Sequence, residues 1–107
     1  MHEQETMILE AQAKMFKALG HPSRLRMLKA LQNGEKCVCE LKTLIGHDMS
    51  TVSKHLSLLK EAGLVVTEKR GTSIYYRLCL CCLETFLSCS EEVICKRIKV
   101  QAELLGK

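Results

Sequence analysis

The sequence predicts a single, mainly helical α+β domain that contains four helical segments, a β-hairpin and a long C-terminal helix. Apolar residues recur at helical spacing in most of the chain, and two strand-like runs flank one polar turn. The 107 residues contain no visible repeat, low-complexity tract or linker. Because hydrophobic residues make up 47% of the chain and charged residues 26%, we expect residues 1–107 to fold as one domain.

The first two helices are indicated by their ends. Apolar residues lie near helical spacing from Thr6 to Leu19, and Gly20 ends this segment. The polar residues 1–5 before it are expected to form a disordered tail that includes His2. Pro22 suits the first turn of the next helix, which we expect to end near Asn33-Gly34.

Two shorter helices and a hairpin follow. The first helix covers residues 38–45 and ends at Gly46, and Ser50 is the expected N-cap of the second, which continues to Ala62. Residues 64–67 and 73–78 are strand-like, and the polar residues 68–72 between them form the predicted turn.

The last segment, residues 82–105, has a helical pattern with apolar residues over a wide arc. A helix of this kind can face both its own domain and a partner, so we interpret it as a dimerisation helix. A chain this short buries only part of its apolar surface alone, and a dimer can share one core.

The order of helix, turn, helix and charged hairpin is typical of a winged helix-turn-helix, which binds double-stranded DNA. In the helix after Ser50, Val52, Leu56 and Leu59 form one stripe that should face the core. The polar residues then point outward, where they can reach base edges and phosphates. The residues expected to contact DNA are Ser50, Thr51, Ser53, Lys54, His55 and Ser57 on this helix, and Lys69 and Arg70 in the hairpin turn.

Two of these residues have more specific expectations. Ser50 lies at the helix N-terminus, where free backbone N–H groups favour a phosphate. His55 lies beside the apolar stripe and either reaches a phosphate or packs. The net charge of +4 permits DNA binding without requiring it.

Four segments resemble the ArsR/SmtB family of regulators, in the same order as in that family. They are residues 16–28, 50–56, 62–65 and 70–78. The resemblance covers about residues 10 to 100. It implies a homodimer that represses an operator when ligand-free and releases the DNA on binding a ligand. For such a dimer we expect an imperfectly palindromic operator, with half-sites about one helical turn apart or somewhat more.

The polar N-terminus lacks the basic and apolar regions of a signal peptide, and no apolar run approaches the ~20 residues of a membrane span. We therefore expect a cytoplasmic protein without membrane association. In a reducing compartment, cysteines are expected to be free thiols, soft-metal ligands or redox sensors. The chain has seven, at Cys37, Cys39, Cys79, Cys81, Cys82, Cys89 and Cys95.

Cys37 and Cys39 lie at the start of the helix that precedes the predicted recognition helix. Thiolate is the metal-binding form, and a helix N-terminus lowers the pKa of a thiol. Residues two apart do not share a face of a regular helix, so both sulfurs can bind one ion only if the first turn is extended or distorted. Ligand binding here should therefore strain the helix that supports the recognition helix.

Residues 37–41 also resemble the Cys-Val-Cys-Asp-Leu box of the family's arsenic and cadmium sensors. Two departures are visible. Lys42 stands where the arsenic version often carries a third cysteine. The cadmium and lead version has additional cysteines nearer the N-terminus, whereas here no cysteine precedes Cys37. A third ligand must therefore come from elsewhere.

The best candidates for this ligand are Cys82 and Cys89. The dimerisation helix would place them near the subunit boundary, where they could reach the Cys37 and Cys39 pair of either subunit. Cys79 and Cys81 lie at the junction before this helix, and Cys95 is interpreted as a small hydrophobic residue. Three thiolates suit As(III) or Sb(III), four suit Cd²⁺ or Zn²⁺, and Cu(I) and Pb²⁺ are further alternatives. A carboxylate–imidazole zinc site is not expected, since the last helix has no histidine. His21 is expected to cap or pack, and His47 to lie in a loop.

The sequence thus predicts a dimeric repressor that releases its operator when a thiophilic metalloid or metal ion, arsenite first, binds cysteine thiolates. The alternatives are a thiol-redox or persulfide-sensing repressor of the same fold, and a DNA-binding protein without an effector. An enzyme is disfavoured, because the chain has no phosphate-binding glycine motif and no evident nucleophile–base pair.

Overall fold

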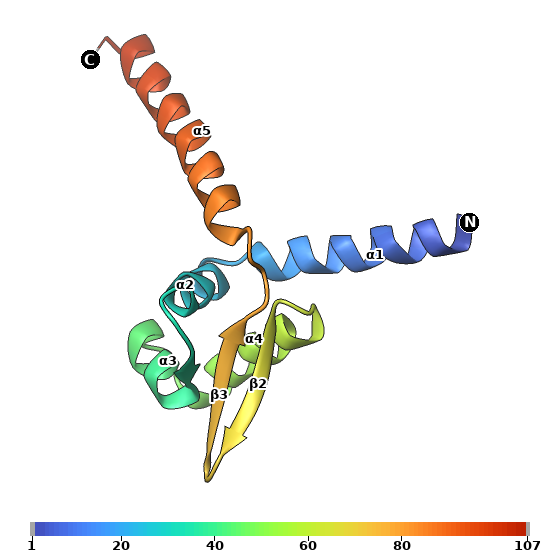
Figure 1. The fold of residues 1–107 in the computed structure, drawn as a ribbon. Coiled ribbons are helices and arrows are strands. Elements are labelled where there is room, and N and C mark those ends of the chain that lie inside the picture. The colour runs from blue at the N-terminus through green and yellow to red at the C-terminus, as the bar shows by residue number, and fades with distance from the viewer. Residues whose placement is uncertain (1, 107) are drawn as a thin grey trace.

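The structure, a computed structural model that describes residues 2–106, consists of a small body of helices and sheet from which two long helices project (Figure 1). Its elements are α1 (His2–Leu19), α2 (Pro22–Leu31), β1 (Lys36–Cys37), α3 (Val38–Ile45), α4 (Met49–Glu61), β2 (Val65–Arg70), β3 (Ser73–Leu78) and α5 (Leu83–Leu104). The mainly helical α+β class, the hairpin and the long C-terminal helix are confirmed.

The start of the first helix and the end of the second differ from the sequence prediction. Helix α1 begins at His2, so residues 2–5 are helical and not a disordered tail. Glu3 and Glu5 lie in its first turn, where a negative charge interacts favourably with the helix dipole. Helix α2 ends at Leu31, two residues earlier than expected.

Local side-chain and backbone chemistry sets the other ends. His21 is the N-cap of α2, and its Nδ1 accepts a hydrogen bond from the Ser23 backbone N–H at 3.1 Å, as the capping prediction required. Helix α3 covers the predicted residues and ends at Gly46, whose φ of +79° is readily adopted only by glycine.

The sheet has three antiparallel strands in the order β1-β3-β2. Strands β2 and β3 form the predicted hairpin, with Val65 opposite Leu78 and Arg70 opposite Ser73. Its tight turn contains Gly71, with a φ of +62°. Strand β1 was not predicted, because a strand of two residues has no hydropathy period of its own.

The core is aliphatic and lies where α2, α3 and α4 pack together above the hairpin. Its members come from nearly every element, and α5 contributes its first residue. The buried hydrophobic residues are Ala18, Leu19, Met27, Leu28, Leu31, Leu41, Ile45, Val52, Leu56, Leu59, Leu64, Val65 and Leu83.

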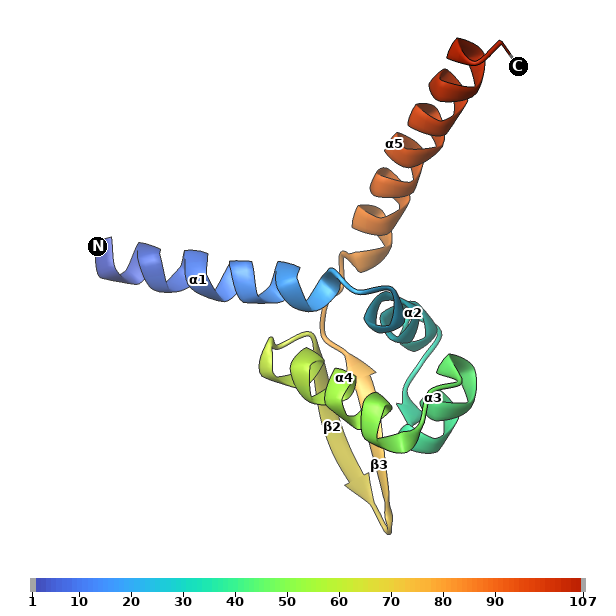
Figure 2. The ribbon, with the colours of Figure 1, turned by 180° about the vertical axis from the view of Figure 1, so that it is seen from behind.

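Helices α1 and α5 diverge from one point on this body and leave their apolar faces uncovered (Figure 2). Phe16 and Phe86 meet near that point, with ring centroids 6.2 Å apart. The large exposed hydrophobic residues further along the two helices include Met7, Ile8, Leu9, Val93, Ile94, Ile98 and Val100. Many large exposed hydrophobic residues on two neighbouring helices are typical of an interaction surface. Within residues 2–106, neither these helices nor any other meets the length and apolarity needed to cross a membrane.

Candidate DNA-binding surface and thiol sites

Helix α4 presents the amphipathic arrangement that a recognition helix requires. Val52, Leu56 and Leu59 are fully buried against the body, as their spacing predicted. The polar residues predicted to contact DNA line the other side of the helix. Ser50, Ser53, Lys54 and Ser57 are exposed, and Thr51 and His55 are half-buried.

The N-cap of α4 is Asp48 and not Ser50, which corrects the sequence prediction. The Asp48 carboxylate accepts hydrogen bonds from the Thr51 backbone N–H at 3.0 Å and from the Ser50 hydroxyl at 3.2 Å. These hydrogen bonds, chiefly the one that Thr51 donates, hold the pKa of the Asp48 carboxyl below its usual value. A phosphate at this helix N-terminus would therefore meet a carboxylate, which weakens the phosphate role expected for Ser50.

His55 is half-buried and packs against groups of the body, whereas its contact with a phosphate stays a prediction. Its ring lies 4.5 Å from that of His21, and its Nδ1 is 3.1 Å from the guanidinium of Arg24. Arg24 also donates to the Ala18 carbonyl at 2.6 Å, so these contacts join α1, α2 and α4. Burial, and then the nearby charges of His21, Arg24 and His47, lower the pKa of His55.

His47 lies in the loop before α4, as predicted, 6.4 Å from the His55 ring between centroids. Its Nε2 is 3.0 Å from the Ser23 hydroxyl. This contact ties the loop that leads into α4 to the start of α2.

The two basic residues of the hairpin lie at the end of β2 and not in the turn. Strand β2 therefore continues to Arg70, beyond the predicted end at residue 67. Lys69 is opposite Ile74 and Arg70 is opposite Ser73. The turn itself consists of Gly71 and Thr72. The hairpin extends away from the helices, as the wing of a winged helix does (Figure 1).

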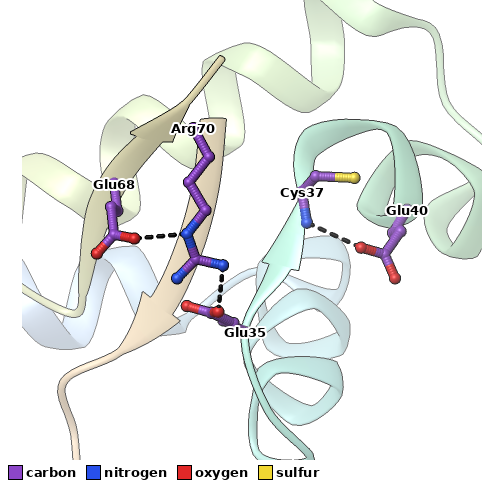
Figure 3. A network of polar contacts seen from close by, with 5 residues as sticks. All are labelled: Glu35, Cys37, Glu40, Glu68 and Arg70. Carbon is purple, nitrogen blue, oxygen red and sulfur yellow. Dashed lines mark hydrogen bonds and ion pairs between the residues drawn. The ribbon is translucent and has the colours of Figure 1, made fainter. Parts of the chain in front are cut away.

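Arg70 is held by groups of the same chain. Its guanidinium forms a 2.6 Å ion pair with Glu35 and a second ion pair with Glu68, and it lies 4.6 Å from the centroid of the Tyr75 ring. Figure 3 shows the two carboxylates flanking the Arg70 side chain. Hydrogen bonds to Glu35 and then to Glu68 raise the pKa of Arg70 above its usual value.

Cys37 is at once the last residue of β1 and the N-cap of α3. It lies opposite Tyr75 in β3, and its backbone N–H donates to the Glu40 carboxylate at 3.1 Å (Figure 3). The hydrogen bonds from Cys37 lower the pKa of Glu40. Because Cys37 is extended and Cys39 is helical, the two cysteines span a strand-to-helix junction.

The seven cysteines are all free, and none is buried. Cys37 is half-buried and the other six are exposed, so the interpretation of Cys95 as a buried hydrophobic residue is wrong for the single chain. Cys82 is the N-cap of α5, and Cys89 lies on this helix. Among residues 2–106, no three His, Cys, Asp or Glu side chains are grouped closely enough to hold a metal ion. One chain therefore does not bring Cys82 or Cys89 together with Cys37 and Cys39.

Sequence reasoning missed Glu35, Glu40 and Tyr75. Glu35 is far from Arg70 in sequence, and β1 gives no pattern that would place them together. The one available signal is Glu40, because a carboxylate three residues after an N-cap is part of a capping box.

Comparison with known proteins agrees with this geometry. Residues 21–67 match the family described as "Bacterial regulatory protein, arsR family". The chain is 44% identical over 68 residues to the uncharacterized HTH-type transcriptional regulator MJ1325 of Methanocaldococcus jannaschii, over 63% of this chain and 76% of that protein. It is 39% identical over 66 residues to the arsenical resistance operon repressor of Escherichia coli, over 61% of this chain and 56% of that protein. The match thus spans little more than half of the E. coli repressor.

Solved structures show the same fold. The homodimeric winged helix-turn-helix DNA-binding domain Mb0332 of Mycobacterium bovis superposes with a TM-score of 0.76 at 29% identity, over 90% of this chain and 89% of that one. The transcriptional repressor BigR of Xylella fastidiosa superposes with a TM-score of 0.70 at 30% identity, over 87% of this chain and 95% of that one. The winged helix-turn-helix prediction is therefore confirmed, and the chain belongs to the ArsR family of DNA-binding transcriptional regulators.

Proposed function

We propose that this chain forms a homodimeric repressor that leaves its operator when a thiophilic ion, arsenite first, binds the thiolates of Cys37 and Cys39. The observation that carries the proposal is the double position of Cys37, which belongs both to the wing sheet and to the first helix of the helix-turn-helix. An ion bound there would act on both DNA-binding parts of the fold at once.

The segment of residues 35–37 supplies the mechanical connection. Glu35 binds Arg70 of the wing, and Lys36 and Cys37 pair with Tyr76 and Tyr75 of β3. On the other side, Cys37 caps α3, which packs against the recognition helix α4. Drawing the two sulfurs onto one ion would change the backbone at Cys37, and this change would reach the wing through β1 and α4 through α3.

The dimer is supported by the uncovered apolar faces of α1 and α5 and by the homodimeric neighbour from M. bovis. It also provides a source for the missing third sulfur. Since the described chain does not group three ligands, we propose that Cys82 or Cys89 of a second copy completes a three-thiolate site. Three thiolates suit As(III) or Sb(III), whereas Cd²⁺, Pb²⁺, Zn²⁺ or Cu(I) are the alternative effectors.

The test is an anaerobic titration of the reduced protein with arsenite while the anisotropy of labelled promoter DNA reports release. The Cys37→Ser and Cys39→Ser variants should bind the DNA as tightly as the unchanged protein but should no longer release it. Cys95→Ser is the matched control and should respond normally, because this exposed cysteine has no role in the proposed site. Full release of the Cys37→Ser variant by arsenite would refute the proposal.

Mixed dimers test the shared site directly. A chain with Cys37→Ser and Cys39→Ser is combined with a chain with Cys82→Ser and Cys89→Ser. Only a site that spans the subunits is regenerated in this mixture, at one copy per mixed dimer. Restored arsenite binding therefore supports the shared site, and its absence assigns the third ligand to another source.

A second candidate function is thiol-redox or persulfide sensing by a repressor of the same fold. The observation that favours it is the exposure of six of the seven free thiols, since accessible thiolates are the groups that oxidants attack. Polysulfide treatment followed by mass spectrometry distinguishes the two functions. Release of DNA with a new sulfur link, in the absence of any metalloid response, would favour this candidate.

A further inference from the structure

A second Cys-X-Cys sequence, Cys79-Leu80-Cys81, lies at the junction between β3 and α5. Both cysteines are exposed, and both line an open cavity of about 410 Å³. Glu35, Arg77 and Glu84 are the charged residues around the same cavity.

The backbone geometry of this pair differs from that of Cys37 and Cys39. The Cys79 backbone N–H donates to the Leu64 carbonyl at 2.9 Å, which continues the strand pairing beyond the end of β3. Cys81 follows in the turn that leads into α5, which the hydrogen bond from the Leu83 N–H to the Leu80 carbonyl closes. Leu80, between the two cysteines, packs against the core. Both cysteines thus lie outside regular helix and line one cavity.

The donor set selects the kind of ion. Among residues 2–106 there is no group of three metal-ligating side chains, so this cavity offers two sulfurs and no third soft ligand. Carboxylates such as Glu84 are hard ligands that soft ions disfavour. Two thiolates alone suit a soft d¹⁰ cation that accepts linear two-coordinate binding, and Cu(I) is such an ion.

The charges around the cavity are compatible with this occupant. Glu35 is already paired with Arg70, and the remaining charges of Arg77 and Glu84 are opposite in sign. The fixed side chains therefore leave the cavity close to neutral, and the thiolates with their ion supply the remaining charge.

We propose that Cys79 and Cys81 form a second thiol site, separate from Cys37 and Cys39, that binds one Cu(I) ion per chain. Both thiols lose their protons to solvent, two Cu–S bonds form, and the oxidation state of copper does not change. The resulting bis-thiolate carries one negative charge. This site does not depend on the proposed arsenite response.

The position of the site gives it a structural effect. Leu83, the first residue of α5, is fully buried, and its backbone N–H donates to the Leu80 carbonyl at 3.4 Å. An ion that bridges Cys79 and Cys81 would therefore stiffen the connection between the wing strand β3 and α5. Glu35, which lines the same cavity, forms an ion pair with Arg70 of the wing.

The test is a competition titration of the reduced full-length chain with Cu(I) held by a colorimetric chelator under anaerobic conditions. The double variant Cys79→Ser, Cys81→Ser should lose one equivalent of bound Cu(I) per chain, whereas the double variant Cys37→Ser, Cys39→Ser should keep that equivalent. Cys95→Ser is the control for a lone exposed thiol and should bind as the unchanged chain does.

Alkylation mapped by mass spectrometry gives a readout that does not need a folded variant. One equivalent of Cu(I) should protect Cys79 and Cys81 of the unchanged chain from iodoacetamide, and Cys95 should remain reactive. Alkylation of Cys79 and Cys81 at the same rate with and without Cu(I), or unchanged stoichiometry in their double variant, would overturn the proposal. Neither result bears on the arsenite titration, so the two proposals fail separately.

Discussion

Cys37 and Tyr75 lie opposite each other in the β1–β3 ladder, so the thiol segment and the wing are parts of one sheet. The Tyr75 ring in turn lies beneath the guanidinium of Arg70, which Glu35 binds from the chain position just before β1. This closed set of contacts joins the segment that contains Cys37 to the wing.

The first prediction concerns the counter-ion of Arg70. Replacing Glu35 by Gln removes one of the two carboxylates that hold the guanidinium, which becomes more available to DNA phosphates. We expect operator affinity of the ligand-free protein to rise only a few-fold, since a solvent-exposed ion pair contributes little. Arsenite-induced release should weaken, because the link between β1 and the wing is reduced.

Anisotropy titrations with and without arsenite measure both effects. Glu92→Gln, which removes the partner of Lys96 in an exposed ion pair on α5, is the control and should change neither. If the ratio of operator affinities without and with arsenite is the same in the Glu35→Gln variant as in the unchanged protein, this ion pair does not couple arsenite binding to DNA release.

The second prediction concerns the exposed recognition-helix residue Lys54. Replacing Lys54 by Ala should weaken operator binding and reduce the slope of log affinity against log salt by about 1, the value for one lost phosphate contact. Arg70→Ala should have a smaller effect, because Arg70 is already paired within the chain. Binding measured from low to high salt tests both variants, with Lys96→Ala as control. An equal or larger slope change for Arg70 than for Lys54 would contradict this order.

The third prediction concerns pH. The pKa of His55 is below its usual value in the folded chain, so the unfolded chain binds the extra proton first as pH falls. The stability contributed by neutral His55 is therefore present above about pH 6.5, the ordinary value for histidine, and is lost as pH falls through the folded-state pKa.

Thermal unfolding at pH 7.5 and pH 5.5 measures this effect. His55→Gln should lose less stability between these values than the unchanged chain does. His2→Gln is the control, since His2 is exposed at the start of α1. If the two variants depend on pH in the same way, His55 is not the group that titrates.

The fourth prediction uses two leucines of the same helix. Leu56 is fully buried, whereas Leu58 is 45% exposed. Leu56→Ala should reduce the free energy of unfolding by about 2–5 kcal/mol, because it removes apolar contacts and leaves a cavity. Leu58→Ala should cost well under half of that, and denaturant titrations of both variants give the comparison. Similar losses would mean that another surface covers Leu58 in the assembled protein.

The fifth prediction tests the dimer. Ile98→Glu places a charge on the uncovered apolar face of α5, where Ile98 is 61% exposed in the single chain. Burying an unpaired carboxylate is costly, so sedimentation should show a weaker dimer over a concentration series. The neighbouring Lys99→Glu serves as control for the added negative charge. A dimer equally weakened by both variants would argue against α5 as the interface.

Periodic features of the fold were predictable from sequence, and contacts between distant segments were not. Val52, Leu56 and Leu59 repeat at helical spacing, so their burial and the helix that carries them could be predicted. Asp48 and Ser50 are both good N-caps close together, and only the backbone of the preceding loop selects Asp48.

In the candidate site, too, local sequence patterns could be predicted and contacts between distant segments could not. The sequence identifies Cys37 and Cys39 by residue type and spacing. It does not show that Cys37 lies in a strand, because β1 exists only through its pairing with β3. Nor does the sequence show that Arg70 forms an ion pair with Glu35. In the single chain, α5 runs away from the body and the two cysteine groups lie apart, and no local sequence pattern describes this course.

The uncovered faces of α1 and α5 have a genetic consequence. If the proposed dimer forms through these faces, a chain that keeps them but has weakened DNA binding, such as one with Lys54→Ala and Arg70→Ala, should still exchange into dimers with unchanged chains. Each mixed dimer would have only one working half for the expected two-fold operator. Such an allele should therefore be dominant-negative, and the strength of interference should follow the ratio of the two gene products.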